Sequence, residues 1–270
     1  MQKFKIKSFC KINLFLRVLR RLSNGYHSIK TLITFCEIHD VIFIQKIKAN
    51  KDDISFGGRF KKGINKKSNT ITKALSLLRK AKLLKNQAFK ISITKNIPHG
   101  SGLGGGSSDA ARLLNYINLK MKLKLNKKSI TKIASQIGFD VPINLEKKNT
   151  FVTGKQGEIV RINKKFHFNL LIVYPNIICS TKKIYQKNKE INLSSKKLPT
   201  NLDNDKKLIY FLQNERNDLE NVVIQIHPQV KKVINYIKTQ KGCYFSRITG
   251  SGSACIGIFS DMRNAIYAKK

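Results

Sequence analysis

The chain has 270 residues, 41% of them hydrophobic, which suffices for one large core or two modest ones and argues against general disorder. Its net charge of +38 comes mainly from lysines along the whole length, whereas proteins that read bases rely on arginine and stacked aromatic rings, so we expect no specific nucleic-acid partner. The sequence shows neither an apolar run of membrane-spanning length nor the apolar centre of a signal peptide, so we expect a cytoplasmic protein that does not act at a membrane.

The first half of the chain alternates predicted strands with predicted helices. Its pattern predicts strands at 4–9 and 12–19, joined tightly around Cys10 and Lys11, and a third strand at 40–47, followed by a polar loop over 50–68. Helical spacing predicts a helix from the cap residue Asn69 to residue 81, and further helices at 107–119 and 127–138. A strand at 88–94 leads directly into a glycine-rich stretch.

The second half also mixes predicted strands and helices. We expect a hairpin over 153–162, a strand at 168–175, the start of a helix at 180–187 and a polar loop at 188–206. Helical segments follow at 217–223 and 227–239, and 246–259 is typical of a strand, a glycine turn and a strand. A domain boundary is therefore expected near residue 155. The five cysteines form no C-x-x-C pair, which predicts reduced thiols rather than a zinc site or disulfides.

The stretch PHGSGLGGGSSDAA, residues 98–111, lies between a predicted strand and a predicted helix. Glycines let a backbone approach an anion closely, and a helix N-terminus offers amide groups to phosphate oxygens. A flexible linker would not be held between two such elements. Neither familiar phosphate loop fits in detail. No lysine follows the glycines, and the pattern Gly100, Gly102, Gly105 has no acidic residue about 20 positions later.

The same stretch resembles the ATP-binding motif of the GHMP kinase superfamily, the galacto-, homoserine, mevalonate and phosphomevalonate kinases. Further stretches are similar to the member that phosphorylates cytidyl methylerythritol diphosphate in non-mevalonate isoprenoid synthesis: KINLFLRVLRRLSNGYH, GFDVPINL, NDLE and TGSGSACIGIF. The resemblance implies an α+β, two-domain GHMP kinase fold, with a ribosomal-protein-S5-domain-2-like ATP-binding domain over 1–155 and a ferredoxin-like α/β domain over 156–270. It also implies direct in-line transfer from ATP to the 2-hydroxyl of the substrate.

In this superfamily the glycine stretch binds ATP, and the resemblance assigns that role to Pro98, His99, Gly100, Ser101, Gly102, Leu103, Gly104, Gly105, Gly106, Ser107 and Ser108. Asn69 matches a position on the adenine side, but it could equally be only a helix cap. Mg²⁺ would be carried by ATP and touched at most by Ser107 or Ser108, so no metal site of the protein's own is expected. The expected partners are small molecules, and the expected assembly is a monomer or a homodimer.

Two charged residues match the catalytic positions of the family. Asp140 stands where the family has its general base, and a carboxylate there could take the proton of the alcohol that attacks the γ-phosphorus. Lys11 matches a residue that contacts the base and the accepting hydroxyl. The plain alternatives are a solvent-exposed turn aspartate and one more lysine among many.

The resemblance assigns the substrate to a second set of residues. Tyr26 and His27, in the G-Y-H signature, would hold the cytosine by stacking and by a hydrogen bond, and Tyr185 would be the second stacking ring. The other expected substrate contacts are Asn13, Thr181, Gly250, Ser251 and Gly252. As single residues, a Tyr–His pair in a turn could be ordinary surface, Asn13 could be a strand residue beside the core, and the Gly250 turn could be a tight strand connection.

The chain also departs from the family pattern. Phe9 and Cys10 stand where the family usually has Pro-Ala, and Phe139, Ile143 and Asn144 replace the commoner residues around Asp140. None of these changes removes a proposed functional group. Two alternatives stay open: another GHMP kinase acting on a small alcohol without a nucleobase, and, more distantly, a basic protein that binds nucleic acid.

Overall fold

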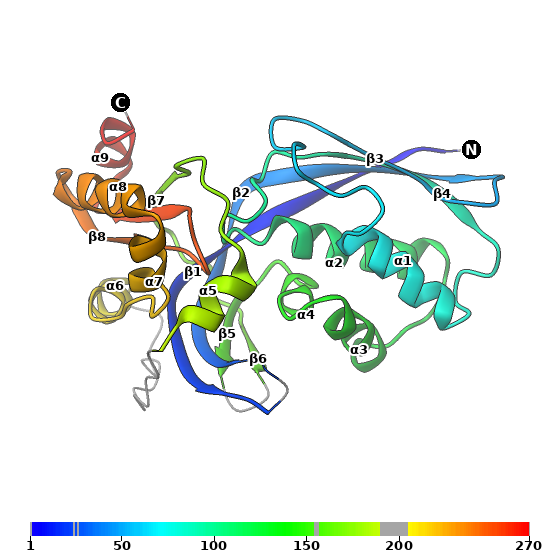
Figure 1. The fold of residues 1–270 in the computed structure, drawn as a ribbon, viewed down its shortest axis with the longest axis horizontal. Helices are drawn as coiled ribbons and strands as arrows, with labels where there is room; N and C mark the ends of the chain where they lie inside the picture. The colour runs from blue at the N-terminus through cyan, green and yellow to red at the C-terminus, as the bar shows by residue number, and fades with distance from the viewer. Residues whose placement is uncertain (1, 24, 26, 154–156, 190–204, 270) are drawn as a thin grey trace. The chain divides into compact units, whose positions relative to one another are not determined.

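The computed structural model describes residues 2–23, 25, 27–153, 157–189 and 205–269 (Figure 1). They form two compact units. Unit 1 comprises Met1–Lys11, Phe35–His99 and Gly104–Lys147, and unit 2 comprises Ile12–Thr34, Gly100–Leu103 and Lys148–Lys270. The chain passes repeatedly from one unit to the other, so residues far apart in the sequence belong to the same unit.

Two long paired strands run through both units. β1 spans Phe4–Arg21 and β2 spans His27–Ile47. The expected break at Cys10 and Lys11 is wrong, because β1 is continuous there. What changes at this point is burial: residues before Cys10 are mostly half-buried or exposed, whereas all residues from Cys10 to Val18 are buried, whichever face they point to. The shift from an alternating to an apolar pattern therefore marks a change in surroundings within one strand.

Unit 1 packs helices on one side of a small sheet, as Figure 1 shows. Residues 41–47 of β2 pair antiparallel with β4 (Ala88–Thr94), and β4 pairs parallel with β3 (Asp53–Gly57). The helices are α1 (Thr70–Lys80), α2 (Gly105–Lys120), α3 (Lys127–Ile137) and the short α4 (Val141–Asn144). Their shared core includes Ile42, Ile91, Leu75, Leu113 and Ile130.

Unit 2 contains two sets of paired strands. Residues 31–33 of β2 pair with β5 (Asn149–Thr153), which forms a hairpin with β6 (Glu158–Ile162). A separate antiparallel sheet has the order β7 (Asn169–Val173), β9 (Cys255–Phe259), β8 (Cys243–Ile248). The described helices of this unit are α5 (Thr181–Lys187), α6 (Asp205–Gln213), α7 (Glu220–Ile226), α8 (Pro228–Thr239) and α9 (Met262–Tyr267).

Several predicted elements are confirmed, and several were missed, among them β3, α6 and the part of β2 before residue 40. The strand at 88–94 and the helix capped by Asn69 match β4 and α1. A hairpin is present, but its first strand, β5, begins at Asn149, before the predicted range of 153–162. The expected loop over 50–68 contains β3, a short edge strand with mixed polarity. Pairing with β4 stabilises β3, and a pattern read from one segment does not show its partner.

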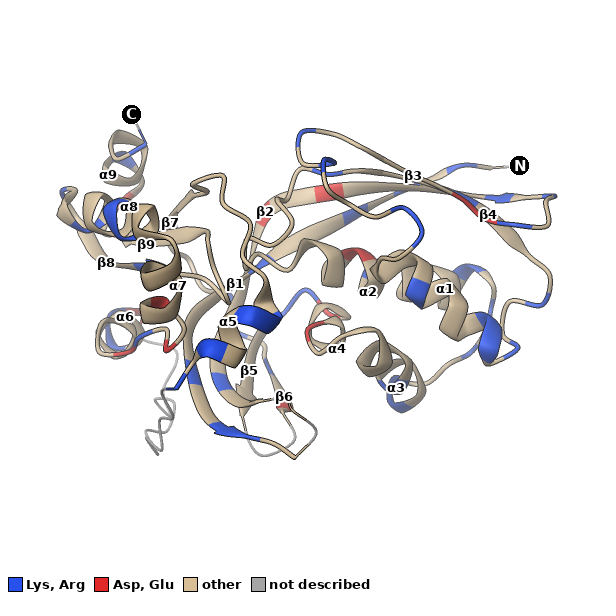
Figure 2. Ribbon diagram, in the orientation of Figure 1, with Lys and Arg blue, Asp and Glu red and all other residues tan. Residues whose placement is uncertain are grey.

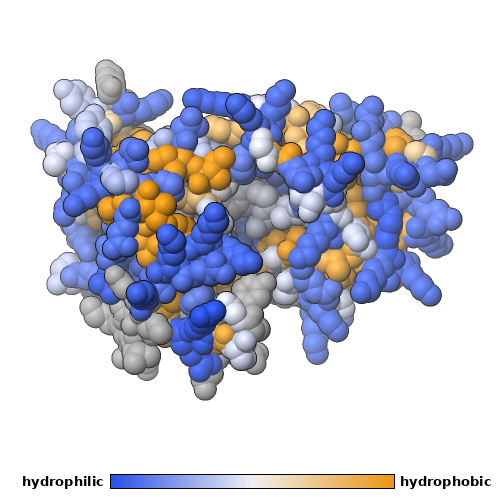
Figure 3. Space-filling view, in the orientation of Figure 1, coloured by the Kyte–Doolittle hydropathy of each residue, from blue (hydrophilic) through white to orange (hydrophobic). Residues whose placement is uncertain are grey.

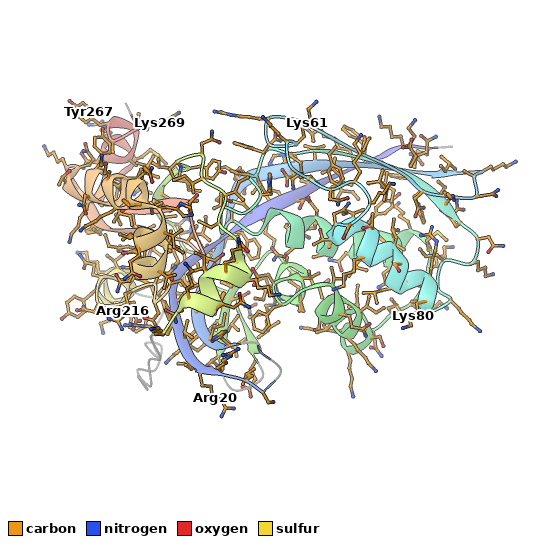
Figure 4. All side chains as sticks on the ribbon, viewed as in Figure 1. Arg20, Lys61, Lys80, Arg216, Tyr267 and Lys269 are labelled. Atoms are coloured by element: carbon orange, nitrogen blue, oxygen red, sulfur yellow. The ribbon has the colours of Figure 1, made fainter. Side chains whose placement is uncertain are left out.

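Charged side chains cover the surface of both units. Lys and Arg positions occur on strands, helices and loops alike, whereas Asp and Glu are few (Figure 2). The face seen in Figure 3 is correspondingly blue with scattered orange patches. The labelled side chains Arg20, Lys61 and Lys80 point away from the ribbon into solvent (Figure 4). None of the helices in the described part of the chain is long and apolar enough to span a membrane.

Candidate active site

The glycine stretch starts helix α2 in a way that leaves its first amides facing outward from the helix end. Gly104 is the N-cap and has a left-handed backbone, with φ of 71°. The first helical hydrogen bond runs from the Ser108 amide to the Gly104 carbonyl, at 2.9 Å, so the amides of residues 105–107 precede it. Within the described residues no side chain caps this end, and its first turn carries no acidic group. The helix terminus is therefore suited to an anion.

Lys11 and Asp140 meet in unit 1, as the sequence predicted for a catalytic pair. The Nζ atom of Lys11 lies 3.3 Å from a carboxylate oxygen of Asp140. The lysine side chain is 4% exposed and the aspartate side chain 34% exposed. A Cβ atom added at Gly104 would lie 2.6 Å from Cγ and 2.9 Å from Cε of Lys11. The lysine therefore packs directly against the start of α2, beside the amides.

The carboxylate of Asp140 takes no part in helix capping. Asp140 is the N-cap of α4, and its side chain makes no capping hydrogen bond. Asn144 instead bonds to the main-chain carbonyl of Asp140 through its side-chain amide, at 2.7 Å. This contact holds the turn while the partly exposed carboxylate stays accessible beside Lys11.

A buried ion triad lies near the N-terminal end of α2, and no pattern in the sequence indicated it. The Nζ atom of Lys95 forms ion pairs with the carboxylates of Asp40 on β2 and Asp109 on α2, and it lies 2.6 Å from the Asp109 oxygen. All three side chains are at most 3% exposed. Asp40 also accepts hydrogen bonds from the amides of Asn96 and Ile97, at 2.6 and 2.8 Å. The triad therefore ties the segment entering the glycine stretch to the helix leaving it.

The electrostatics of the triad follow from its burial. Burial raises the pKa of Asp109 to about 6, although the charge of Lys95 opposes this shift. Burial would lower the pKa of Lys95, but Asp109 and Asp40 together raise it above its usual value. The only available sequence signals were an aspartate inside the GSSDAA motif and a lysine directly after β4, neither of which indicates a partner.

The earlier part of the glycine stretch, residues 100–103, packs in unit 2. The amide of Ala254 donates to the Ser101 carbonyl at 3.0 Å, and the amide of Cys179 donates to the Gly100 carbonyl at 2.7 Å. Gly102 has φ of 83°, and a Cβ there would come within 2.0 Å of the Thr249 carbonyl oxygen. Any side chain would collide with the Thr249 carbonyl, so a glycine is required at position 102, where the glycine stretch meets the turn at Gly250–Gly252.

The second glycine turn is held by Asn217, which the sequence analysis quoted only as part of NDLE. Its side-chain amide donates to the carbonyls of Ile248, at 3.1 Å, and Gly250, at 2.8 Å. The main-chain amide of Asn13 donates a hydrogen bond to the Thr249 hydroxyl at 2.8 Å. The side chain of Asn13 bonds to Thr31 at 2.9 Å. Predicted residues Asn13 and Gly250 are therefore neighbours in unit 2.

Other predicted substrate residues also come together in unit 2. The rings of His27 and Tyr185 lie 5.2 Å apart, centroid to centroid, with 32° between their planes. Burial, together with the charge of Arg21, lowers the pKa of His27, which favours the neutral ring. The hydroxyls of Thr181 and Ser251 are 2.9 Å apart. Tyr26 lies outside the described residues.

Among the remaining predicted residues, Asn69 has a structural role. The Asn69 side chain accepts bonds from the amides of Ile71 and Thr72 and so caps α1. Its contact with adenine stays a prediction. Pro98 is buried and His99 is half-buried at the start of the glycine stretch. Ser108 is buried and Ser107 is partly exposed. Across the described ranges, no three His, Cys, Asp or Glu side chains form a group that could hold a metal ion.

The sequence matches known families over most of its length. The profile of the GHMP kinases N terminal domain matches residues 69–146, and that of the GHMP kinases C terminal domain matches residues 201–269. The 4-diphosphocytidyl-2-C-methyl-D-erythritol kinase of Pelagibacter ubique is 38% identical, covering 96% of this chain and 90% of the relative. The protein of the same name from Anaplasma phagocytophilum is 34% identical, covering 100% of this chain and 90% of the relative.

Solved structures share the fold. A crystal structure of 4-(cytidine 5'-diphospho)-2C-methyl-D-erythritol kinase matches with a TM-score of 0.71 at 24% identity, over 98% of this chain and 93% of that chain. The phosphomevalonate kinase of Streptococcus pneumoniae matches with a TM-score of 0.69 at 13% identity, over 100% of this chain and 95% of that chain. The predicted α+β, two-domain GHMP kinase fold is thereby confirmed.

Proposed function

The chain belongs to the 4-diphosphocytidyl-2-C-methyl-D-erythritol kinases of the GHMP superfamily, and on that premise we propose how its residues perform the reaction. The enzyme transfers the γ-phosphoryl group of ATP to the 2-hydroxyl of its cytidyl substrate, in the non-mevalonate route to isoprenoids. One observation carries the assignment of the chemistry: Lys11 lies against Gly104 at the start of α2, and its Nζ is 3.3 Å from a carboxylate oxygen of Asp140.

ATP binds through the glycine stretch in this proposal. The amides of Gly105, Gly106 and Ser107 receive phosphate oxygens, because they lie at a helix N-terminus that no side chain caps within the described residues. A side chain at Gly104 would occupy the space that Lys11 fills beside these amides. Positive charge and helix dipole therefore act on the same phosphates. We also propose that the other residues of 98–108, and Asn69, contact ATP.

Asp140 acts as the general base, and Lys11 stabilises the charge that develops. The proton of the 2-hydroxyl passes to the Asp140 carboxylate while the oxygen forms its bond to the γ-phosphorus. The bond from that phosphorus to the bridging oxygen breaks in line with the attack, and ADP leaves. Lys11 is nearly buried, so its charge interacts strongly with Asp140 and with the transferring group.

The cytidyl substrate is held by residues of unit 2. The Tyr185 ring stacks on the cytosine, and His27, as a neutral ring, exchanges a hydrogen bond with the base edge. Tyr26 is proposed as the second stacking ring from its place in G-Y-H. The Thr181 and Ser251 hydroxyls, the turn at Gly250–Gly252 and the side chain of Asn13 contact the remaining polar groups of the substrate in this proposal.

Mg²⁺ fits this site as a companion of ATP. Ser107 is partly exposed and Ser108 is buried, so Ser107 is the serine better placed to touch an ion that ATP carries. The ion would neutralise phosphate charge when bound with the nucleotide. We also propose a cytoplasmic location, small-molecule partners only, a monomeric or homodimeric state, and family domains that divide near residue 155.

An assay of ADP release with alternative acceptors tests the proposed function. Turnover should require the cytidyl substrate and should be at background with homoserine, mevalonate or galactose. Turnover with one of these alcohols instead would establish a GHMP kinase of another specificity. Steeply salt-dependent binding to RNA or DNA, without ADP release from any acceptor, would favour the nucleic-acid alternative.

A further inference from the structure

Two cysteine thiols face each other across the long strand pair of unit 1. Cys10 of β1 and Cys36 of β2 have their Sγ atoms 2.8 Å apart. Phe15 of β1 and Thr31 of β2 are also in contact, through a hydrogen bond from the threonine hydroxyl to the phenylalanine carbonyl. Both pairs, Cys10 with Cys36 and Phe15 with Thr31, are centred on Ser23 in the sequence. Cys10 and Cys36 are therefore opposite residues of the β1–β2 pair. The proposed transfer reaction uses neither thiol.

The strand geometry suits a disulfide between them. Opposite residues of an antiparallel pair have Cα atoms about 4.5 or about 5.5 Å apart, and both values lie within the span of about 4.4–6.8 Å that disulfides bridge. The sulfur atoms already approach to within about 0.8 Å of the bonded distance of about 2.0 Å. A small movement of the two side chains is enough to form the bond.

We propose that Cys10 and Cys36 are a reversible oxidation site, at which a small disulfide such as glutathione disulfide forms an intramolecular disulfide that slows phosphoryl transfer through the neighbouring Lys11. The modification itself rests on the geometry of the two thiols. Its effect on turnover rests on the proposed role of Lys11.

Cys36 is the thiol that reacts first. Cys10 is fully buried, whereas Cys36 is partly exposed. The hydrogen bond from Cys10 lowers the pKa of Cys36, with smaller contributions from a backbone hydrogen bond of Ile38 and the charge of Lys147, although burial and the charge of Glu37 oppose this shift. Lys147 lies close to this part of the strands, 3.5 Å from the Phe9 ring centroid and 2.6 Å from a carboxylate oxygen of Glu37. Cys36 is therefore the more nucleophilic of the pair.

The other thiols provide a contrast. The hydrogen bond with the Cys36 thiol and burial both raise the pKa of Cys10. Burial raises the pKa of Cys179 to about 11 and that of Cys255 to about 12, and it raises the pKa of Cys243 as well. Of the five cysteines, Cys36 alone combines exposure, a lowered pKa and a thiol within reach. Oxidation should therefore begin there and stay within the pair.

The exchange consumes one glutathione disulfide and takes two steps. The Cys36 thiolate attacks one sulfur of glutathione disulfide, forms a mixed disulfide and releases glutathione thiolate. The Cys10 thiol then passes its proton to the departing glutathione sulfur as its own sulfur attacks the Cys36 sulfur. The new Cys10–Cys36 bond forms as the bond to glutathione breaks, and a second glutathione leaves. The protein loses two electrons and two protons, and the small disulfide becomes two thiols.

The consequence for turnover comes from the position of Cys10 directly before Lys11. Neighbouring residues of a strand point to opposite faces, so a disulfide at Cys10 does not block the face of Lys11 but fixes the backbone that carries it. The Lys11–Asp140 contact then shifts from its 3.3 Å geometry. A displacement of about 1 Å at a catalytic group costs up to about 100-fold in rate. The Michaelis constant for ATP should change little.

The experiment separates the modification from its effect. The full chain is incubated with glutathione disulfide, remaining thiols are blocked, and non-reduced peptides are mapped by mass spectrometry. We expect a peptide pair linking Cys10 to Cys36 and a mass lower by two hydrogens, with kcat reduced between about 10- and 100-fold and restored by dithiothreitol. A failure of the proposed kinase function would leave the peptide map unchanged, so the two failures are distinguishable.

Matched variants decide the outcome. Cys36→Ser should keep its kcat in glutathione disulfide, whereas Cys243→Ser, which removes another partly buried thiol, should lose activity as the wild type does. A wild-type chain whose map shows only glutathione adducts, or no modification, would overturn the proposal. It would also be overturned if the Cys10–Cys36 bond formed and kcat stayed unchanged.

Discussion

Lys11 and Asp140 differ in burial, and the difference fits different tasks. The lysine is held by packing against Gly104, so its position is fixed before any ligand binds. The aspartate is partly exposed and bears no capping bond, so an alcohol can reach its carboxylate. A fixed positive charge beside an accessible carboxylate is the arrangement that general-base catalysis of phosphoryl transfer needs.

The first prediction concerns this carboxylate. Asp140→Asn should lower kcat at least about 100-fold, because the amide cannot take the proton of the 2-hydroxyl. The Michaelis constant for ATP should stay close to that of the wild type, since Asp140 acts on the acceptor. Steady-state kinetics measure both, with Asp53→Asn, an exposed carboxylate on β3, as the control. An Asp140→Asn enzyme with most of its turnover would show that Asp140 is only a turn residue.

The second prediction concerns the ring of Tyr185. Base–aromatic stacking contributes about 1–3 kcal/mol, so Tyr185→Ala should raise the Michaelis constant for the cytidyl substrate about 5- to 150-fold. Tyr185→Phe should leave the Michaelis constant for the cytidyl substrate nearly unchanged, because stacking does not need the hydroxyl. The constant for ATP serves as the internal control and should change in neither variant. Equal effects of Tyr185→Ala on both substrates would argue for a structural role beside His27.

At the scale of elements, the start of α2 should depend on Gly104 more than on Gly106. Gly104→Ala places a Cβ against the Lys11 side chain and holds an alanine at φ of 71°, so it should reduce kcat and weaken ATP binding. Gly106→Ala meets only ordinary contact distances, the nearest being 3.4 Å to the Thr70 hydroxyl, and should lose much less. Titration calorimetry with ATP and assays of both variants test this. Similar losses in the two would show that the loop responds to any side chain.

The buried triad makes a stability prediction for the same loop. Lys95→Met leaves Asp40 and Asp109 buried without their shared cation, which should destabilise the fold by about 3–5 kcal/mol. Lys90→Met removes an exposed ion pair with Asp53 and should cost at most about 1 kcal/mol. Urea unfolding of the two variants provides the comparison. If Lys95→Met lost no more stability than Lys90→Met, the triad would not be what anchors β4 to α2.

The sequence predicted those elements whose signals lie within a single segment. Asn69 caps α1 through residues two and three positions away, and β4 shows its own alternation of apolar and polar residues, so both were found. β3 depends on its partner strand, and the continuity of β1 depends on what covers each face, so neither could be read from one segment.

The candidate site follows the same division. The glycine stretch and the Lys11–Asp140 pair were found because short motifs carry them. The triad was missed because its members lie on β2, after β4 and on α2, and only folding brings them together. The Cys10–Cys36 contact was missed for the same reason.

At the scale of the whole molecule, charge is the dominant feature. The 53 basic side chains outnumber the 15 acidic ones, so a net repulsion remains however the charges pair. Figure 2 shows basic positions on strands, helices and loops, not gathered on one strand or helix. Such a distribution gives no defined track for a nucleic-acid backbone. It also places like charges closer together in the folded chain than in the unfolded one.

The last prediction is that sodium chloride stabilises this protein. Raising the ionic strength from about 0.01 M to about 0.15 M shortens the screening length from about 30 Å to about 8 Å, which weakens the long-range repulsion between surface lysines. Buried pairs such as Lys95–Asp109 are screened much less, so their contribution should persist. The midpoint of thermal unfolding should therefore rise with salt, and sucrose of matched osmolality should reproduce little of the rise. A midpoint that falls with salt would mean that surface ion pairs contribute more than the net repulsion between like charges.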